Sequence, residues 1–214
     1  VAKEKIVVVG GITFKPRIPG NCHLQHLTLR QAKKWGVWGW SSFTMDDVLV
    51  EQCGGYGVVA YGTGVVGGCT NLEVRHCGFS GVLAFDGASI TLIGAKTTVH
   101  HNCTDGDSNW YGLQVRGSSA STVQLVDPLT KEQVALDNGG GGNWGAGNGA
   151  DLNHLKTITV AAAAAEMAEA AAAAAVAAAV ARGEVRVPED CKTLMEAVNQ
   201  VHRDDRWTTI VLGQ

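Results

Sequence analysis

The chain has 214 residues, which is enough for one large domain or two small ones. Charged residues make up only 17% of it and the formal net charge is -3, so neither a disordered charged tail nor a protein that neutralises nucleic-acid phosphates is expected. The 28 glycines follow no collagen-like period, and with only 4 prolines they indicate many tight turns in a β structure.

Three segments in the first half of the chain align with one another without gaps. Each consists of a short alternating apolar strand, a turn that contains glycine and a second strand. A looser fourth copy follows and is interrupted by an insertion. The first three copies begin at Leu27, Val48 and Leu72, and the fourth is made of Val99–Cys103 and Gly112–Arg116.

The spacing of the copies is typical of a solenoid, in which each copy adds one coil. Leucine-rich repeats share the period, but their Asn/Cys-x-Leu signature is missing. We therefore predict an all-β solenoid over residues 1–160, a right-handed parallel β-helix of about six or seven coils. The steps of 21, 24 and 26 residues are those between Ala32, Cys53, Cys77 and Cys103.

Stacked copies place equivalent residues in columns about 4.8 Å apart along the stack. Leu29 and Val50 then share a column that faces the core. Arg30, Glu51 and Arg75 form the next column, which faces outward and alternates in charge. Such ladders are usually solvated pairs between neighbouring strands.

A column of small residues is expected inside the stack. It contains Ala32, Cys53 and Cys77, and we predict that both cysteines are buried free thiols that pack against each other. Cys103 continues this column. Because that cysteine is expected to be buried, the glycosylation sequon that starts at Asn102 is not expected to be used.

The last part of the chain changes character. Alanine fills 16 of the 21 positions from residue 161 to residue 181, and we predict an Ala-rich helix or linker over 161–183. Two glutamates and the weak hydrophobicity of alanine argue against a membrane span. Residues 184–214 have a strand-helix-strand pattern. We predict that the helix runs back along the stack and that Trp207–Leu212 pair with Ile6–Val9.

Three stretches carry a resemblance to a known family: Gly20–Arg30, Ser42–Val48 and Val187–Leu194. The predicted coils resemble those of the right-handed parallel β-helix, or pectin-lyase-like, superfamily, and the first two stretches are similar to β-helix repeat proteins of algae. The third resembles the segment that caps the N-terminal end of such folds. Here the cap-like segment, 184–214, follows the coils instead of preceding them. Two arrangements would explain this order: a sequence cut across tandem units, or a circularly permuted unit.

This superfamily includes pectate lyases, polygalacturonases and epimerases. These enzymes act on uronate polymers with carboxylates and a base on one exposed sheet, so the resemblance implies that such residues could carry an activity here. Of the polygalacturonase-like set only Asp46 and Asp47 are present, so hydrolysis is not expected. A polysaccharide lyase or epimerase is the alternative, with Asp47, His26 and Arg30 as its candidate catalytic residues. Calcium is expected only in that case, and no other cofactor is. A polar surface without catalysis explains the same residues, and the sequence favours a protein that is not an enzyme.

Aromatic residues form the main candidate binding site. Trp40, Tyr61 and Phe85 fall in one outward column, which Arg116 continues, and Trp38 lies beside it. A strip of this size exceeds the scattered apolar residues of an ordinary surface. We predict a structural or carbohydrate-binding module whose partner is a polysaccharide or another protein domain, not nucleic acid. Cover by another part of the same chain is the alternative.

Histidines give no metal site by their spacing. His23 and His26 lack a third ligand at a suitable distance in the sequence. His100 and His101, with His76 one coil earlier, could suggest a metal site, but His76 aligns with Gln31, Gln52 and Asn102, and this column is interpreted as side-chain amides stacked at a corner of the fold. We therefore predict no metal ligands.

Overall fold

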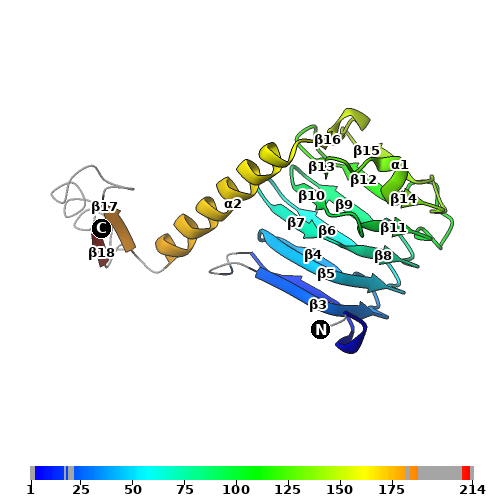
Figure 1. The fold of residues 1–214 in the computed structure, drawn as a ribbon, viewed down its shortest axis with the longest axis horizontal. Helices are drawn as coiled ribbons and strands as arrows, with labels where there is room; N and C mark the ends of the chain where they lie inside the picture. The colour runs from blue at the N-terminus through cyan, green and yellow to red at the C-terminus, as the bar shows by residue number, and fades with distance from the viewer. Residues whose placement is uncertain (1–2, 17, 19–21, 182–183, 188–208, 213–214) are drawn as a thin grey trace.

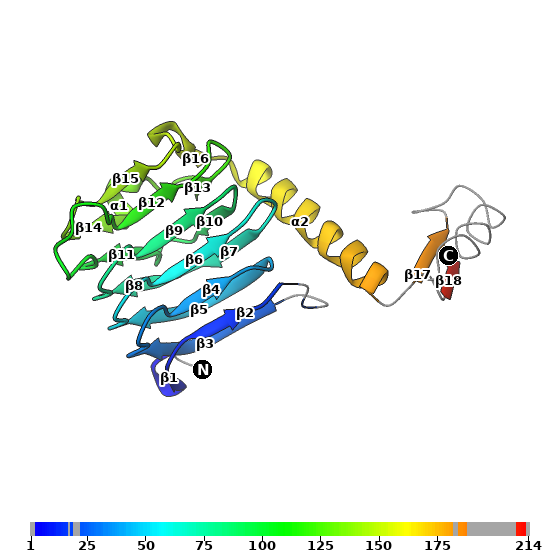
Figure 2. The same cartoon turned by 180° about the vertical axis from the view of Figure 1, so that it is seen from behind.

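The computed structural model describes residues 3–16, 18, 22–181, 184–187 and 209–212 (Figure 1). Its strands form two large parallel sheets and a separate sheet of two strands. Residues from both large sheets contribute to a single apolar core. Strands of successive sequence copies lie one above another, so each further copy adds strands to one end of the sheets (Figures 1 and 2).

The first large sheet has ten strands. Eight of them pair in the order β14-β11-β8-β5-β7-β10-β13-β16, while β3 pairs with β5 and β1 pairs with β3. The strands are β1 (Val7–Val9), β3 (Cys22–Arg30), β5 (Phe43–Glu51), β7 (Val66–Thr70), β8 (Glu73–Arg75), β10 (Ser89–Ile93), β11 (Thr98–His100), β13 (Thr122–Val126), β14 (Ala135–Leu136) and β16 (Leu155–Ile158).

The second large sheet has six strands in the order β15-β12-β9-β6-β4-β2. They are β2 (Ile12–Phe14), β4 (Val37–Gly39), β6 (Val58–Tyr61), β9 (Val82–Phe85), β12 (Leu113–Arg116) and β15 (Trp144–Gly147). The remaining elements are the 3-10 turns η1 (Lys3–Lys5) and η2 (Leu152–His154), the helices α1 (Lys131–Val134) and α2 (Val160–Ala181), and the strand pair β17 (Glu184–Val187) and β18 (Thr209–Leu212).

This architecture corrects the predicted fold class. The repeat predicted an all-β solenoid in the form of a right-handed parallel β-helix. The structure instead has two parallel sheets, of ten and six strands, accompanied by helices, which is an α/β-like arrangement. The sequence pattern could not separate these possibilities, because parallel in-register pairing of short apolar strands is common to solenoids and to the parallel sheets of α/β proteins.

The pairing of the aligned copies is nevertheless the one that the repeat predicts. Leu29 lies opposite Val50, and Val50 lies opposite Val74, in the ten-stranded sheet. Val37 lies opposite Val58 in the six-stranded sheet. All five side chains are fully buried, so the apolar positions of each copy fill the core between neighbouring copies.

The predicted column of small residues is confirmed. Ala32, Cys53 and Cys77 are buried, and both cysteines are free thiols. The hydrogen bond between the two thiols, together with burial, raises the pKa of Cys77, whereas the same bond lowers the pKa of Cys53. Burial raises the pKa of Cys69 to about 12. All three thiols are buried, so they pack as small apolar side chains.

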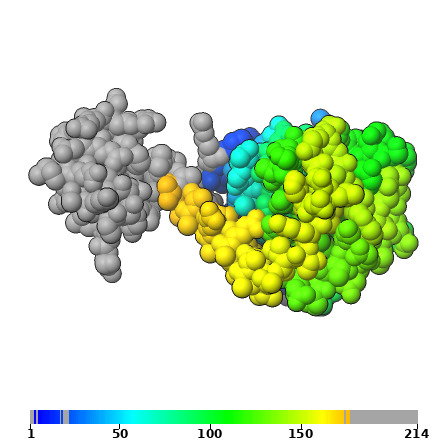
Figure 3. Space-filling view, turned by 90° about the horizontal axis from the view of Figure 1, so that it is seen from above, coloured from blue at the N-terminus to red at the C-terminus, as the bar shows by residue number. Residues whose placement is uncertain are grey.

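Helix α2 begins against the ten-stranded sheet. Ala163 is buried there, Met167 contacts the backbone at Gly68, and the hydroxyl of Ser89 donates a 2.6 Å hydrogen bond to Glu166. Seen from above in Figure 3, the first turns of α2 lie against the body of the two sheets. Among the described helices, none is both long and apolar enough to cross a membrane.

The last described strand does not pair with the first one. Strand β18 pairs in parallel with β17, whereas β1 pairs with β3. Figures 1 and 2 show β17 and β18 beyond the far end of α2. The predicted pairing of Trp207–Leu212 with Ile6–Val9 is therefore wrong for the described strands. The predicted helix of the cap-like segment lies within 188–208, outside the described residues.

Candidate functional site

One surface of the six-stranded sheet carries a continuous group of rings, which we call the aromatic face. Alternation along the strands creates it, because Val37, Val58 and Val82 point into the core and their neighbours point away from it. The rings come from β4, β6 and β9, from the residues next to these strands, and from the loop before β12. The members are Trp35, Trp38, Trp40, Tyr56, Tyr61, Phe79, Phe85 and Trp110.

Trp38 lies at the centre of the aromatic face. Its ring centroid is 4.8 Å from that of Trp35, 5.7 Å from Trp40, 6.0 Å from Tyr56 and 5.9 Å from Tyr61. Most of these pairs are tilted or edge-on, which is the favoured geometry for aromatic contacts. The rings therefore support one another and hold a fixed surface.

The predicted column of Trp40, Tyr61 and Phe85 is continuous in the structure. The centroids of Trp40 and Tyr61 are 6.2 Å apart, and those of Tyr61 and Phe85 are 5.2 Å apart. Arg116 lies opposite Phe85 in the next strand, so the order of the four residues is as the repeat predicts. Trp40, with 37% of its surface exposed, is the only ring of the aromatic face among the exposed large apolar residues.

The insertion in the fourth copy covers part of this sheet. Trp110, near its end, stacks on Phe79 at 5.0 Å and contacts Tyr56 at 5.3 Å. The guanidinium of Arg116 lies 5.0 Å from the Trp110 ring centroid, a cation–π contact. Gln114, under this loop, is buried and bonds to the carbonyl of Asn109. The chain thus covers one end of the aromatic face and leaves the end around Trp40 accessible.

Sequence reasoning missed half of the aromatic face. Trp35 and Tyr56 occupy the same position of two aligned copies, immediately before a glycine, so the alignment contained their signal. Phe79 stands one position earlier in its copy. Trp110 belongs to the insertion, whose path no repeat pattern predicts.

Two phenol groups of the aromatic face stay neutral at physiological pH. A hydrogen bond with Asp86 raises the pKa of Tyr61, and burial raises the pKa of Tyr56. A neutral phenol both donates and accepts hydrogen bonds. The aromatic face therefore offers flat apolar surfaces with polar groups at its edge, which is the usual composition of a binding surface for neutral polar ligands.

The candidate catalytic residues Asp47 and His26 do meet. Nδ1 of His26 is 3.2 Å from Oδ2 of Asp47, and both residues adopt left-handed backbone conformations. Asn71, which the sequence placed in the same column, has the same conformation, but its side-chain oxygen accepts from the Lys96 amide at 3.4 Å. The His26 and Asp47 pair lies on β3 and β5, in the ten-stranded sheet and not in the sheet that carries the aromatic face.

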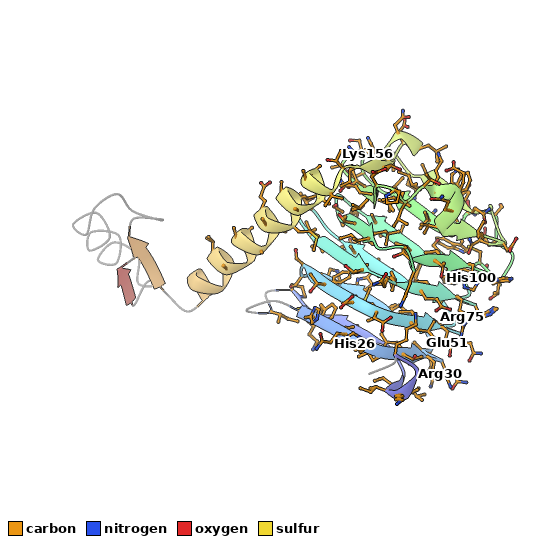
Figure 4. All side chains as sticks on the ribbon, viewed as in Figure 1. His26, Arg30, Glu51, Arg75, His100 and Lys156 are labelled. Atoms are coloured by element: carbon orange, nitrogen blue, oxygen red, sulfur yellow. The ribbon has the colours of Figure 1, made fainter. Side chains whose placement is uncertain are left out.

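Arg30, the third catalytic candidate, belongs to an ion-pair ladder (Figure 4). Its Nη2 is 2.6 Å from Oε1 of Glu51, and Nη2 of Arg75 is 2.8 Å from Oε2 of the same carboxylate. The ladder continues through Glu73, which pairs with Arg75 at 2.9 Å and with Lys3 at 3.0 Å. A guanidinium that remains protonated and is held by a carboxylate does not act as a base, so Arg30 has a structural role in this arrangement.

The buried member of the ladder is Glu51, whose surface is 4% exposed. Burial alone would raise its pKa, but the hydrogen bonds from Arg75 and Arg30 outweigh burial and hold the pKa below its ordinary value. Glu51 is therefore ionised over the physiological range. Sequence reasoning expected this column to be solvated, and the structure shows that its central carboxylate is not.

Asn102 is committed to the fold. Its side-chain amide donates to the Val74 carbonyl at 3.0 Å, and its side-chain oxygen accepts from the Cys77 amide at 3.1 Å. A second amide side chain, that of Asn138, accepts from it at 3.0 Å. Asn102 is 1% exposed, so the asparagine of the glycosylation sequon packs inside the fold.

Comparison with known proteins gives no relative: no protein-family model, no curated protein and no solved structure matches the chain. The resemblance to the pectin-lyase-like superfamily therefore stays a prediction.

Proposed function

We propose that the chain is a non-catalytic module that binds carbohydrate through the accessible end of the aromatic face. The observation that carries the proposal is the row formed by Trp38, Trp40, Tyr61 and Phe85, whose rings contact one another and remain partly open to solvent. Sugars present apolar C–H faces that stack on aromatic rings, while their hydroxyls bond to polar groups at the edge of the surface.

Rigidity supports this proposal. Each ring of the row contacts at least one other ring of the face, and the strands beneath are in register, so little side-chain freedom is lost when a ligand binds. Binding surfaces that are ordered in advance avoid much of the entropic cost of association. A neutral saccharide is also compatible with a chain whose formal net charge is only -3.

The separation of the two sites favours binding without catalysis. The rings lie on the six-stranded sheet, whereas the His26 and Asp47 pair lies on the ten-stranded sheet. A saccharide stacked on the rings is therefore not presented to that base. Catalysis needs the reacting groups within hydrogen-bond reach of the substrate.

The experiment is a binding screen of soluble polysaccharides by affinity electrophoresis, followed by tryptophan fluorescence titration of those that bind. Trp40→Ala is expected to weaken binding at least about tenfold, because a ring stacked on a ligand contributes about 1.5 kcal/mol or more. Leu136→Ala is the matched control, since Leu136 is 46% exposed on β14 of the other sheet. Equal affinity of Trp40→Ala and the parent protein for every ligand would overturn the proposal.

A polysaccharide lyase or epimerase is the second candidate, and only the pairing of His26 with Asp47 favours it. A carboxylate on Nδ1 orients a histidine so that its Nε2 can accept a proton. Incubation with uronate polymers, with and without calcium, followed by measurement of unsaturated product, tests this candidate. Product that forms with the parent protein and is lost in both His26→Ala and Asp47→Ala would support it over the non-catalytic module.

A further inference from the structure

Three histidines meet at one corner of the ten-stranded sheet, away from both sites described above. His100 ends β11, and His101 follows it directly. His76 follows β8, the neighbouring strand, so it stands one copy away from His101. His76 and His101 have the same left-handed conformation, with φ of 54° each, and their ring centroids are 5.4 Å apart.

Two of these imidazoles already point nitrogen at nitrogen. Nδ1 of His100 is 2.8 Å from Nδ1 of His101. Two nitrogens bound at right angles to a metal, at about 2.0 Å each, are about 2.8 Å apart, whereas tetrahedral angles would separate them by about 3.3 Å. The observed separation is that of an N–H···N hydrogen bond, and it equals the separation of two nitrogens in neighbouring positions of a square-planar ion, so the two nitrogens would not have to move apart to bind one.

The second nitrogen of His100 lies near a carboxylate, outside hydrogen-bond distance. Its Nε2 is 3.8 Å from Oε1 of Glu73, and that carboxylate is held by Arg75 at 2.9 Å and Lys3 at 3.0 Å. With its proton on Nε2, His100 accepts the hydrogen bond from Nδ1 of His101, so a metal ion must replace the proton that His101 donates. A small movement of the ring would bring Nε2 within hydrogen-bond distance of this carboxylate, the arrangement that supports the histidine ligands of many metal sites.

We propose that His100 and His101 chelate a divalent transition-metal ion, Cu²⁺ before others, through their two Nδ1 atoms, and that His76 rotates to supply a third nitrogen. Imidazole suits copper and nickel, and copper binds most strongly among the divalent ions of its row. In the described part of the chain no group of three such side chains converges as it stands, so the rotation of His76 is an essential part of the proposal. His76 is exposed, which leaves its side chain room to turn.

The charges around the corner are compatible with a bound cation. The carboxylate of Glu73, whose Oε1 lies 3.8 Å from Nε2 of His100, places a negative charge beside the proposed ligands. The positive charge of Arg75 is balanced by its ion pairs with glutamates in the ladder.

The experiment uses the full chain with Cys191→Ser, which removes the one thiol outside the described residues. Copper(II) chloride alone is the probe, with equilibrium dialysis against a weak competing chelator and electron paramagnetic resonance as readouts. We expect one equivalent of Cu²⁺ with nitrogen ligands. Zinc is expected to bind at least tenfold more weakly.

Variants separate this site from incidental binding. His101→Asn, which keeps a residue that tolerates the left-handed conformation, and His100→Gln should each weaken copper binding at least tenfold. His76→Asn should remove one nitrogen from the spectrum. His23→Ala, which changes an exposed histidine on β3, is the control and should leave copper binding unchanged.

Glu73→Gln supplies a second test, because it alters no ligand and should weaken copper binding more modestly. Circular dichroism confirms the fold of each variant. Copper binding that survives His100→Gln and His101→Asn, or that falls equally in His23→Ala, would overturn the proposal.

Discussion

Replacement of the buried carboxylate in the ion-pair ladder, Glu51→Gln, tests whether the ladder stabilises the fold. Glu51 accepts three hydrogen bonds, one from Arg30 at 2.6 Å and two from Arg75 at 3.0 and 2.8 Å. A hydrogen bond to a charged group contributes about 1.5–3 kcal/mol. The sum of three is an upper bound, because glutamine keeps one acceptor and the arginine side chains, 41% and 34% exposed, regain water.

We therefore expect Glu51→Gln to lower the free energy of unfolding by about 2–3 kcal/mol at pH 7. For a chain of this length that loss lowers Tm by about 5–10 °C. Urea denaturation followed by circular dichroism measures it. Glu132→Gln is the control, since Glu132 is exposed on α1, and its effect should stay within about 0.5 kcal/mol.

The pH dependence of the difference is the stricter test. The folded-state pKa of Glu51 lies below its unfolded value, so its contribution is fully present above the unfolded pKa of about 4.3 and is lost as the pH falls through the folded pKa. Glutamine does not titrate. The stability difference between parent and variant should therefore shrink as the pH is lowered from 5 towards 2, and a difference that is constant with pH, or absent at pH 7, would refute the reasoning.

Two further predictions concern close packing between copies. A Cβ at Gly57 would collide with the backbone carbonyl oxygen of Gly81, so Gly57→Ala should lower the free energy of unfolding by about 2–3 kcal/mol in urea denaturation. A Cβ at Gly147 would meet only ordinary contacts at 3.7–3.9 Å. The control Gly147→Ala should therefore lower it by less than about 0.5 kcal/mol. Cys53 and Cys77 should resist a thiol reagent in the native protein and react fully after denaturation; mass spectrometry of the alkylated peptides checks this, and a disulfide between them would contradict it.

The sequence predicts the packing of neighbouring copies well because that packing is local to the repeat. Alternation fixes which face of a strand is buried, and the gapless alignment fixes the register, so the burial of Leu29, Val50 and Val74 follows from the sequence alone. The order of Tyr61 and Phe85 in the aromatic face follows in the same way.

Features that depend on distant parts of the chain are not predictable from the repeat. The arrangement of the strands into two sheets is decided by the turns and by the elements around them, and parallel register is the same in either fold class. Trp110 reaches Phe79 only through the path of an insertion. The burial of Glu51 depends on two arginines from the copies before and after it. The pattern of alternating charge predicts that these residues pair, but it does not predict how deeply the carboxylate is buried.

The turns beside these strands also bear on how the protein can diversify. Gln31, Gln52, His76 and His101 occupy one corner position of successive copies, all with φ of 54–55° and all exposed. The backbone there requires a residue that tolerates the left-handed region, and asparagine, aspartate and histidine do so most readily. Selection or design can therefore replace the exposed side chains along this corner with others of different chemistry without repacking the interior. Gln52→His, for example, would carry a row of imidazoles one copy further along the molecule.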